Sequence, residues 1–155
     1  KLLISSQNYI TTLSEDYFQY LKNIYLIDLS FNKISKIQLI GVTSLFKNPI
    51  RLRYLYLNNN LLTSNHLYLI NVNSIINLIS FNLSFNNISY LNKQMFNKLE
   101  KLIILDLSFN PIRAIETLAI NDLIMLSHFH LIFSLNNTNL QNFSNIFQNN
   151  FINNS

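Results

Sequence analysis

The chain has 155 residues, among them 28 Leu, 22 Ile and 27 Asn, whereas Gly occurs once, Pro twice, and Cys and Trp are absent. So apolar a composition excludes an intrinsically disordered chain. The single glycine excludes a glycine-rich phosphate loop, and the lack of cysteine excludes a disulfide framework and Cys-ligated metal sites. The net charge of +4 comes from 11 basic residues without a block of like charge, so the sequence predicts no nucleic-acid surface.

The length of the chain fits one domain with a sizeable buried core. No apolar run approaches the ~20 residues of a membrane-spanning helix, so we expect no membrane segment. The chain begins with Lys1 rather than Met and shows no secretory leader, which suggests a fragment or a processed product.

The sequence is built from internal repeats. The string Leu-Ser-Phe-Asn occurs three times, and when its Asn is position zero, apolar residues recur at −11, −8, −5, −3, +2 and +5. Two further units share this frame, and the spacings between successive asparagines are 24, 28, 26 and 24. The five position-zero residues, in chain order, are Asn8, Asn32, Asn60, Asn86 and Asn110.

Each unit predicts one coil of a solenoid. Residues −5 and −3 point to one face of a strand, and the residues between them point to the other face. After a first strand in the Asn8 unit, this places strands in chain order near 26–30, 54–58, 80–84, 104–108 and 128–132. One coil buries too little apolar surface alone, so stacked coils must share a continuous core.

The last unit fits two frames. Ser134 lies 24 residues after Asn110, Thr138 lies 28 residues after it, and each frame explains half of the segment. We therefore predict a repeat domain over 1–143, with five clear units and a degenerate sixth, followed by an Asn-rich tail over 144–155.

The recurrent Asn predicts a structural ladder at the turn of each coil. An amide side chain both donates and accepts, so stacked asparagines can bridge the backbones of neighbouring coils where no helix or sheet satisfies them. With one glycine in the chain, these turns must rely on Asn.

The pattern resembles the leucine-rich repeat, Leu-x-x-Leu-x-Leu-x-x-Asn-x-Leu, over nearly the whole chain. Phe18, Phe46 and Phe96 stand fourteen residues before successive asparagines, with Val72 and Ile120 in corresponding places. This row resembles the phenylalanine spine of the typical, 24-residue subclass. The resemblance implies an α/β solenoid, a horseshoe arc with a concave parallel sheet of about six strands and an irregular or short-helical convex side.

The same resemblance implies a surface for a protein or peptide ligand on the concave side. Six strands make a face ~25 Å wide, which suits a macromolecular partner better than a buried small molecule. Tyr54 and Tyr56 are candidate hot spots, although good strand propensity alone also explains them. The candidate face comprises Asp28, Tyr54, Tyr56, Asn58, Asn82, Asp106, His128 and His130.

The sequence gives less support to other candidate sites. In the Ser134 frame His130 stands beside Asp106, and such an arrangement can hold a metal ion. We expect an exposed polar pair or a pH-sensitive contact instead. We therefore predict no metal and no cofactor. Phe31, Phe85 and Phe109 at position −1 are expected to belong to the packing of the repeat. Sequons make Asn87, Asn136 and Asn142 possible glycosylation sites.

The seven acidic residues are dispersed, and no triad, nucleophile elbow or metal signature is present, so we expect no enzyme. The typical subclass is common in receptor ectodomains, which predicts a fragment of an extracellular receptor that binds a protein or peptide. The alternative is a cytoplasmic repeat scaffold or regulatory subunit, because the Cys-rich caps usual in extracellular members are absent.

Overall fold

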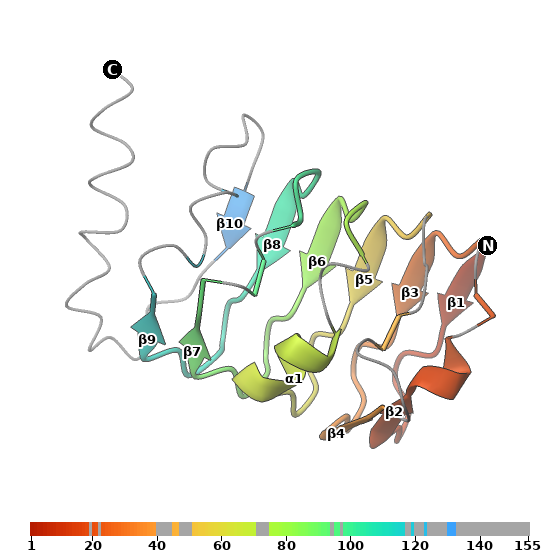
Figure 1. Cartoon of the computed structure of the whole chain (residues 1–155). Helices are drawn as coiled ribbons and strands as arrows, with labels where there is room; N and C mark the ends of the chain where they lie inside the picture. The colour runs from red at the N-terminus through yellow and green to blue at the C-terminus, as the bar shows by residue number, and fades with distance from the viewer. Residues whose placement is uncertain are drawn as a thin grey trace.

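A parallel β-sheet of six short strands forms one side of the solenoid (Figure 1). The strands are β1 (Leu2–Ile4), β3 (Leu26–Asp28), β5 (Tyr54–Tyr56), β6 (Ser80–Asn82), β8 (Ile104–Asp106) and β10 (His130–Ile132), and they are neighbours in that order. The computed structural model describes residues 1–18, 20–21, 23–39, 45–46, 51–70, 75–93, 95–96, 98–116, 119, 123 and 130–132.

The register of the sheet follows the repeat. Each central strand residue at −5 pairs with the −5 residue of the neighbouring coils: Leu3, Ile27, Leu55, Phe81, Leu105 and Leu131. From Ile27 to Leu105 these side chains are fully buried. The core therefore lies behind the sheet, and the strand residues at −6 and −4 face away from it. This arrangement is the leucine-rich repeat solenoid that the sequence predicts.

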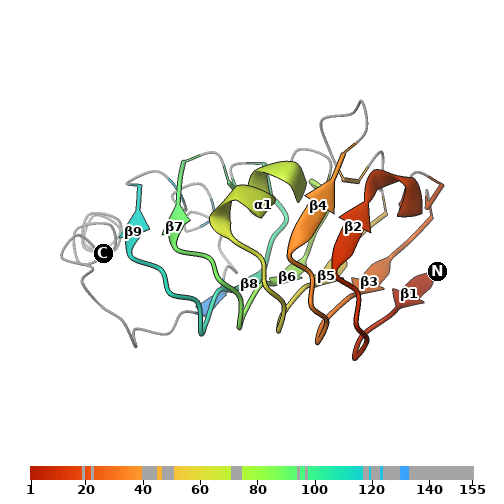
Figure 2. The same cartoon turned by 90° about the horizontal axis from the view of Figure 1, so that it is seen from below.

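The opposite side of each coil carries short, varied elements (Figure 2). β2 (Thr12–Ser14) pairs with β4 (Lys36–Gln38), and β7 (Tyr90–Leu91) pairs with β9 (Ala114–Ile115), both in parallel. A 3₁₀ turn, η1 (Glu15–Tyr17), follows β2, and the helix α1 (Ser64–Ile70) lies between the two strand pairs. In the described part of the chain no helix has the length and apolarity to cross a membrane.

The helix α1 interrupts strand pairing on this side, and its first residue replaces the missing backbone bonds. The buried Ser64 hydroxyl donates to the Tyr90 carbonyl at 2.8 Å and accepts from the Ser89 and Tyr90 N–H groups at 3.0 Å. Leu67 and Ile70 of the helix pack into the core. This hydroxyl thus adds three hydrogen bonds between a helical coil and a coil with a strand.

Four asparagines at position zero bond each coil to the preceding one. Each side-chain carbonyl accepts from a backbone N–H of the preceding coil, at 2.9 or 3.0 Å. Each side-chain amide donates to a backbone carbonyl of the preceding coil, also at 2.9 or 3.0 Å, and to two carbonyls of its own coil. These buried residues are Asn32, Asn60, Asn86 and Asn110.

Asn8 occupies the same repeat position but has a different role. Its amide is exposed and donates to the Ser6 carbonyl of its own coil at 2.9 Å. The first coil joins the ladder through its backbone, since the Ser5 carbonyl and the Ile10 N–H bond to Asn32. The expectation of five equivalent ladder residues therefore needs correction at Asn8.

The residue before each position-zero Asn has a left-handed backbone. The φ angles are 56° at Gln7, 53° at Phe31, 54° at Asn59, 53° at Phe85 and 53° at Phe109. This conformation costs roughly 1–2 kcal/mol for a residue other than glycine. The N–H of the first four donates to the next coil at 2.9 or 3.0 Å, so the turn extends the backbone ladder beyond the strand. The turn thus depends on a residue that the sequence analysis had assigned only to packing.

The last described strand corrects the register expected for the sixth unit. His130 pairs with Ile104 and Ile132 pairs with Asp106, so neither the Ser134 nor the Thr138 frame is right. Counting four residues on from Ile132 puts position zero at Asn136, which lies outside the described residues, as does the tail over 144–155. Leu and Ile are frequent in this part of the sequence, so apolar spacing alone does not fix the register.

We expect Asn86→Ala to lower the free energy of unfolding by about 2–4 kcal/mol, because the buried N–H of Leu62 loses its acceptor and the carbonyls of Leu57 and Leu83 each lose one of two amide donors. Asn8→Ala is the matched control and should cost less than about 0.5 kcal/mol, because its amide is exposed. Urea unfolding followed by circular dichroism measures both. Equal losses would show that the inter-coil bonds carry no stability.

Candidate functional site

The outward residues of the six-stranded sheet form the concave face. Among the candidate residues, Asp28, Tyr54, Tyr56, Asn58, Asn82 and Asp106 are all half-buried and lie on this face or at its lower edge. His128 lies outside the described residues, and only the backbone of His130 is described. In the sheet His130 opposes Ile104 rather than Asp106, so the pairing of His130 with Asp106 expected from the Ser134 frame is wrong.

Three concave residues at position −4 cap the turn that follows them. One side-chain oxygen of Asp28, Asn82 and Asp106 accepts from the N–H of the serine two residues later at 2.9 or 3.0 Å. The same oxygen accepts from that serine's hydroxyl at 2.6–2.8 Å. These side chains therefore have a structural role in their own coil, as Asx turns do.

The Asn60 coil lacks this pair and carries tyrosines instead. Tyr54 lies between Tyr25 and Tyr56, with ring centroids at 5.3 and 6.5 Å and ring planes tilted by 58° and 54°. Tyr54 and Tyr56 are half-buried, and Tyr25 is 43% exposed. We call Tyr25, Tyr54 and Tyr56 the tyrosine cluster. The sequence analysis missed Tyr25 because it stands at −7, one residue before its strand.

The local environment raises the pKa of two phenols in the cluster. A side-chain hydrogen bond with Tyr54 raises the pKa of Tyr25 above its ordinary value, burial adds to the rise, and Arg53 opposes it. Burial, chiefly, raises the pKa of Tyr56, with further contributions from Tyr54 and Asp28. The hydroxyls of Tyr25 and Tyr56 therefore stay protonated at neutral pH and offer donors as well as acceptors to a partner.

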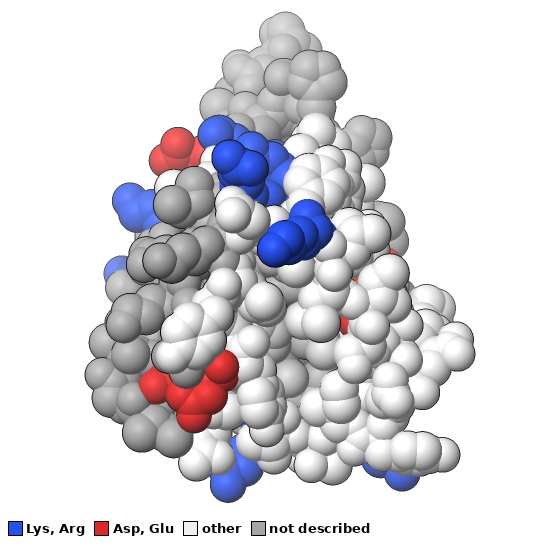
Figure 3. Space-filling view, turned by 90° about the vertical axis from the view of Figure 1, so that its right-hand side faces the viewer, with Lys and Arg blue, Asp and Glu red and all other residues white. Residues whose placement is uncertain are grey.

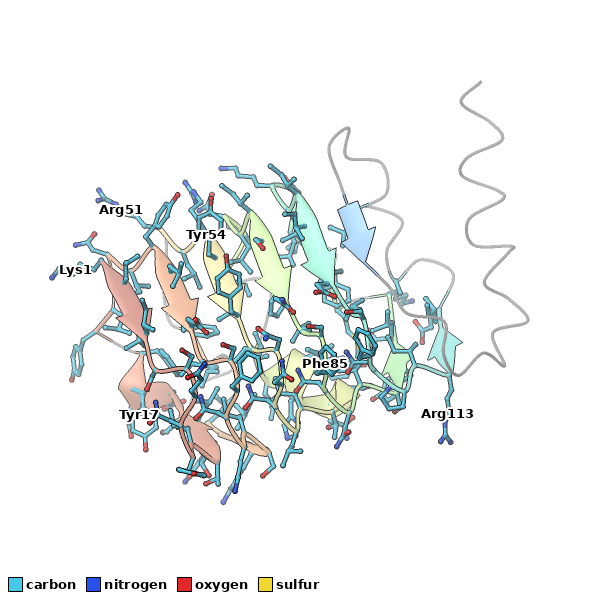
Figure 4. All side chains as sticks on the ribbon, turned by 180° about the vertical axis from the view of Figure 1, so that it is seen from behind. Lys1, Tyr17, Arg51, Tyr54, Phe85 and Arg113 are labelled. Carbon is cyan, nitrogen blue, oxygen red and sulfur yellow. The ribbon has the colours of Figure 1, made fainter. Side chains whose placement is uncertain are left out.

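Charge is unevenly distributed on the described surface. Figure 3, which faces the N-terminal end of the solenoid, shows several Lys and Arg side chains in its upper part with an acidic side chain beside them, an acidic group at the lower left, and a broad uncharged area on the right. In Figure 4, Lys1, Arg51 and Tyr54 project from the edge where the strands begin, whereas Arg113 lies at the far end of the opposite side. The sequence analysis treated the basic residues as dispersed, and the coiling of the chain brings some of them together.

The position −1 phenylalanines form a second feature, at the edge where the strands end. Phe31, Phe85 and Phe109 are 51%, 47% and 52% exposed. Phe85 and Phe109 stack on each other with centroids at 4.1 Å and an interplanar angle of 14°. They pack along the surface of the turn row and not in the core, because the left-handed backbone turns them outward.

The sequon residues lie in different places. Asn87 is exposed, and its backbone pairs with Thr63 at the start of the opposite side. Asn136 and Asn142 lie outside the described residues. Asn82 is on the concave face, where its side-chain oxygen caps a turn.

The described residues include no cluster of three or more His, Cys, Asp or Glu side chains with the spacing of a metal site. Asp28 and Asp106 are separated by β5 and β6 in the order of the sheet, so they do not form an acid pair. In the described part of the chain, the concave face offers aromatic surface and hydroxyl groups, which suit binding.

Comparison with known proteins bears on the fold. The chain is similar to the crystal structure of the TLR13–ssRNA13 complex, with a TM-score of 0.59 and 22% identity over 86% of this chain and 22% of that chain. It is also similar to the glycosylated Toll–Spatzle complex of Drosophila, with a TM-score of 0.52 and 21% identity over 87% of this chain and 21% of that chain. The chain thus spans about a fifth of each. No protein-family model and no curated protein matches the sequence.

We expect Tyr54→Phe to lower the pKa of Tyr25, because the hydrogen bond with Tyr54 is the main cause of its rise. Because the pKa of Tyr25 is higher in the folded than in the unfolded state, its protonated hydroxyl stabilises the fold. This contribution is fully present below the unfolded-state pKa and is lost as the pH rises through the folded-state pKa. NMR titration of the Tyr25 ring carbon in both proteins measures the shift. Tyr90→Phe, outside the cluster, is the control, and an unchanged Tyr25 titration in Tyr54→Phe would contradict the assignment.

Proposed function

We propose that this chain is a non-catalytic recognition module whose concave face binds a protein or peptide segment. The tyrosine cluster is the observation that carries the proposal. Tyrosine adds large contact area and a polar tip at little cost in side-chain entropy, which is why it is enriched among binding hot spots. Here three tyrosines occupy adjacent coils of a rigid sheet, with their rings already in mutual contact.

The departure of one coil from the repeat supports a binding role. Among the coils from Asn32 to Asn110, only the Asn60 coil lacks the Asp or Asn that caps its turn through a serine. Tyr56 and Asn58 stand in the two positions. The Asn60 coil gives up the local hydrogen bonds that cap the turn in the other coils, and it presents aromatic side chains instead. Contact with a ligand would explain why these residues stand there.

We further propose that the repeat domain extends over 1–143, that 144–155 is a tail, and that the chain belongs to a larger extracellular receptor ectodomain of the typical subclass. The buried Phe18, Phe46 and Phe96 support the subclass, and Phe18 and Phe46 meet edge to face at 4.9 Å. The exposed Asn87 is compatible with a glycan on the side away from the concave face. A cytoplasmic scaffold is the alternative, and residence of the full-length protein inside the cell would favour it.

The two similar structures hold different ligands, RNA with TLR13 and Spatzle with Toll. The carboxylates of Asp28 and Asp106 on the concave face favour a protein or peptide here, because a phosphate backbone laid along the strands would meet like charge. We therefore propose that the ligand of this face is not a nucleic acid.

The double variant Tyr54→Ala/Tyr56→Ala should weaken peptide binding at least roughly tenfold without changing the circular dichroism spectrum, because hot-spot tyrosines contribute ~2 kcal/mol or more each when buried by a partner. The probes are peptides selected from a random phage-displayed library on the immobilised wild-type chain. Surface plasmon resonance measures their affinity for each variant.

The control is Tyr20→Ala, which removes a tyrosine that is 81% exposed and lies outside the cluster. Selected peptides that bind the double variant and the wild type equally would place the binding surface elsewhere and overturn the proposal. Selected RNA aptamers that depend on Tyr54 and Tyr56 when no peptide does would replace the ligand class.

A further inference from the structure

Three basic residues lie at the edge of the sheet where the strands begin, and the side chains of two of them converge on Asn77. Arg53 donates from Nη1 to the backbone carbonyl of Asn77 at 3.0 Å, and Lys101 donates from Nζ to the side-chain carbonyl of Asn77 at 2.8 Å. Arg51 is exposed two residues before Arg53, on the same edge (Figure 4). We call Arg51, Arg53 and Lys101 the rim cations.

The rim cations come from two coils and are held together by the coil between them. They precede β5 and β8, and Asn77 precedes β6, which lies between those strands. The edge is ordered by backbone bonds from Arg53 to Tyr25 at 2.9 Å and from Ile79 to Arg53 at 2.7 Å. The positive charges are therefore fixed relative to the tyrosine cluster, and Arg53 is close enough to Tyr25 to oppose the rise of its pKa.

Within the described residues no carboxylate forms an ion pair with the rim cations, and Glu100 is the one acidic residue adjacent to any of them in sequence. The concave carboxylates nearest along a strand, Asp28 and Asp106, stand three or more residues further on, or ~10 Å. That separation is about one Debye length at physiological salt, so the rim keeps its positive potential.

We propose that the rim cations, together with the tyrosine cluster, bind an acidic peptide segment of a partner protein. This deepens the proposed function and rests on it. An extended segment places alternate side chains ~7 Å apart, and the long side chains of Arg51 and Lys101 close the remaining difference to the ~10 Å between their coils. Arginine binds carboxylates in a bidentate way. The segment meets the cations at the rim, and an aromatic or apolar neighbour packs on Tyr25 and Tyr54.

An acidic peptide fits this surface better than RNA. Neighbouring tyrosine rings are tilted by 58° and 54° against one another, so they form no parallel platform for a run of stacked bases. The positive potential is limited to the edge where the strands begin, and the carboxylates of Asp28 and Asp106 lie further along the strands. A short acidic segment avoids them, whereas a longer strand of phosphates laid across the sheet does not.

The test is an NMR titration of the whole chain labelled with nitrogen-15. The probes are a decapeptide of alternating Glu and Ser with a terminal Phe, the same peptide with Gln in place of Glu, and a ten-nucleotide single-stranded oligouridine. The variants are Arg51→Gln/Arg53→Gln and the control Arg113→Gln/Lys36→Gln, which removes the same charge from exposed residues on the opposite side. Tyr54→Ala/Tyr56→Ala is titrated in parallel.

We expect the Glu peptide to shift the side-chain signals of Arg51 and Arg53, to bind more weakly as salt rises, and to lose roughly tenfold in affinity in Arg51→Gln/Arg53→Gln but not in the control. Unchanged affinity in the rim variant, with a loss in the tyrosine variant, overturns the rim proposal and leaves the concave face as the binding site. Unchanged affinity in both variants overturns both proposals. Tighter binding of oligouridine through the same arginines, or no binding of the Glu peptide, also overturns the acidic-peptide assignment.

Discussion

The hydrogen bonds of the position-zero asparagines are the interaction on which the rest of the solenoid depends. A coil of about 25 residues closes on itself through a turn whose backbone groups face the interior and have no partner within regular secondary structure. Asn32, Asn60, Asn86 and Asn110 supply those partners from the next coil, with one acceptor and one donor aimed at the coil before. Because each amide also bonds to its own coil, it fixes turn shape and stacking distance together.

This arrangement explains why the chain accepts a left-handed backbone at residues as large as Phe31, Phe85 and Phe109. The conformation is unfavourable for a bulky side chain, and glycine would adopt it more easily. The asparagine that follows gains inter-coil hydrogen bonds only when the chain turns at this place, and those bonds offset the strain. The outward position of the phenylalanines follows from the same geometry.

Much of the fold can be predicted from the sequence because each apolar position of the repeat corresponds to one place in the coil. Leu55, Phe81 and Leu105 are inward, paired and buried as the spacing predicts. The register at His130 was wrong because Leu, Ile and Phe fit both the Ser134 and the Thr138 frames in part, and the pairing with β8 supports neither frame. Tyr25 and the contact of Arg53 and Lys101 through Asn77 were missed for another reason. They lie before the strands, where the repeat prescribes no residue type, and only stacking brings them together.

That difference divides the concave side into a structural part and a variable part. At the ends of the strands, the −4, −2 and −1 positions repeat nearly the same residues, because Asp28, Asn82 and Asp106 cap turns through the serines that follow. At the beginnings of the strands the residues change from coil to coil, with Tyr25, Arg53 and Ile79 standing in one row. The turn chemistry places no demand on that row, so its side chains are free to match a partner. Recognition by this solenoid is therefore expected near the beginnings of the strands, where the tyrosine cluster and the rim cations meet.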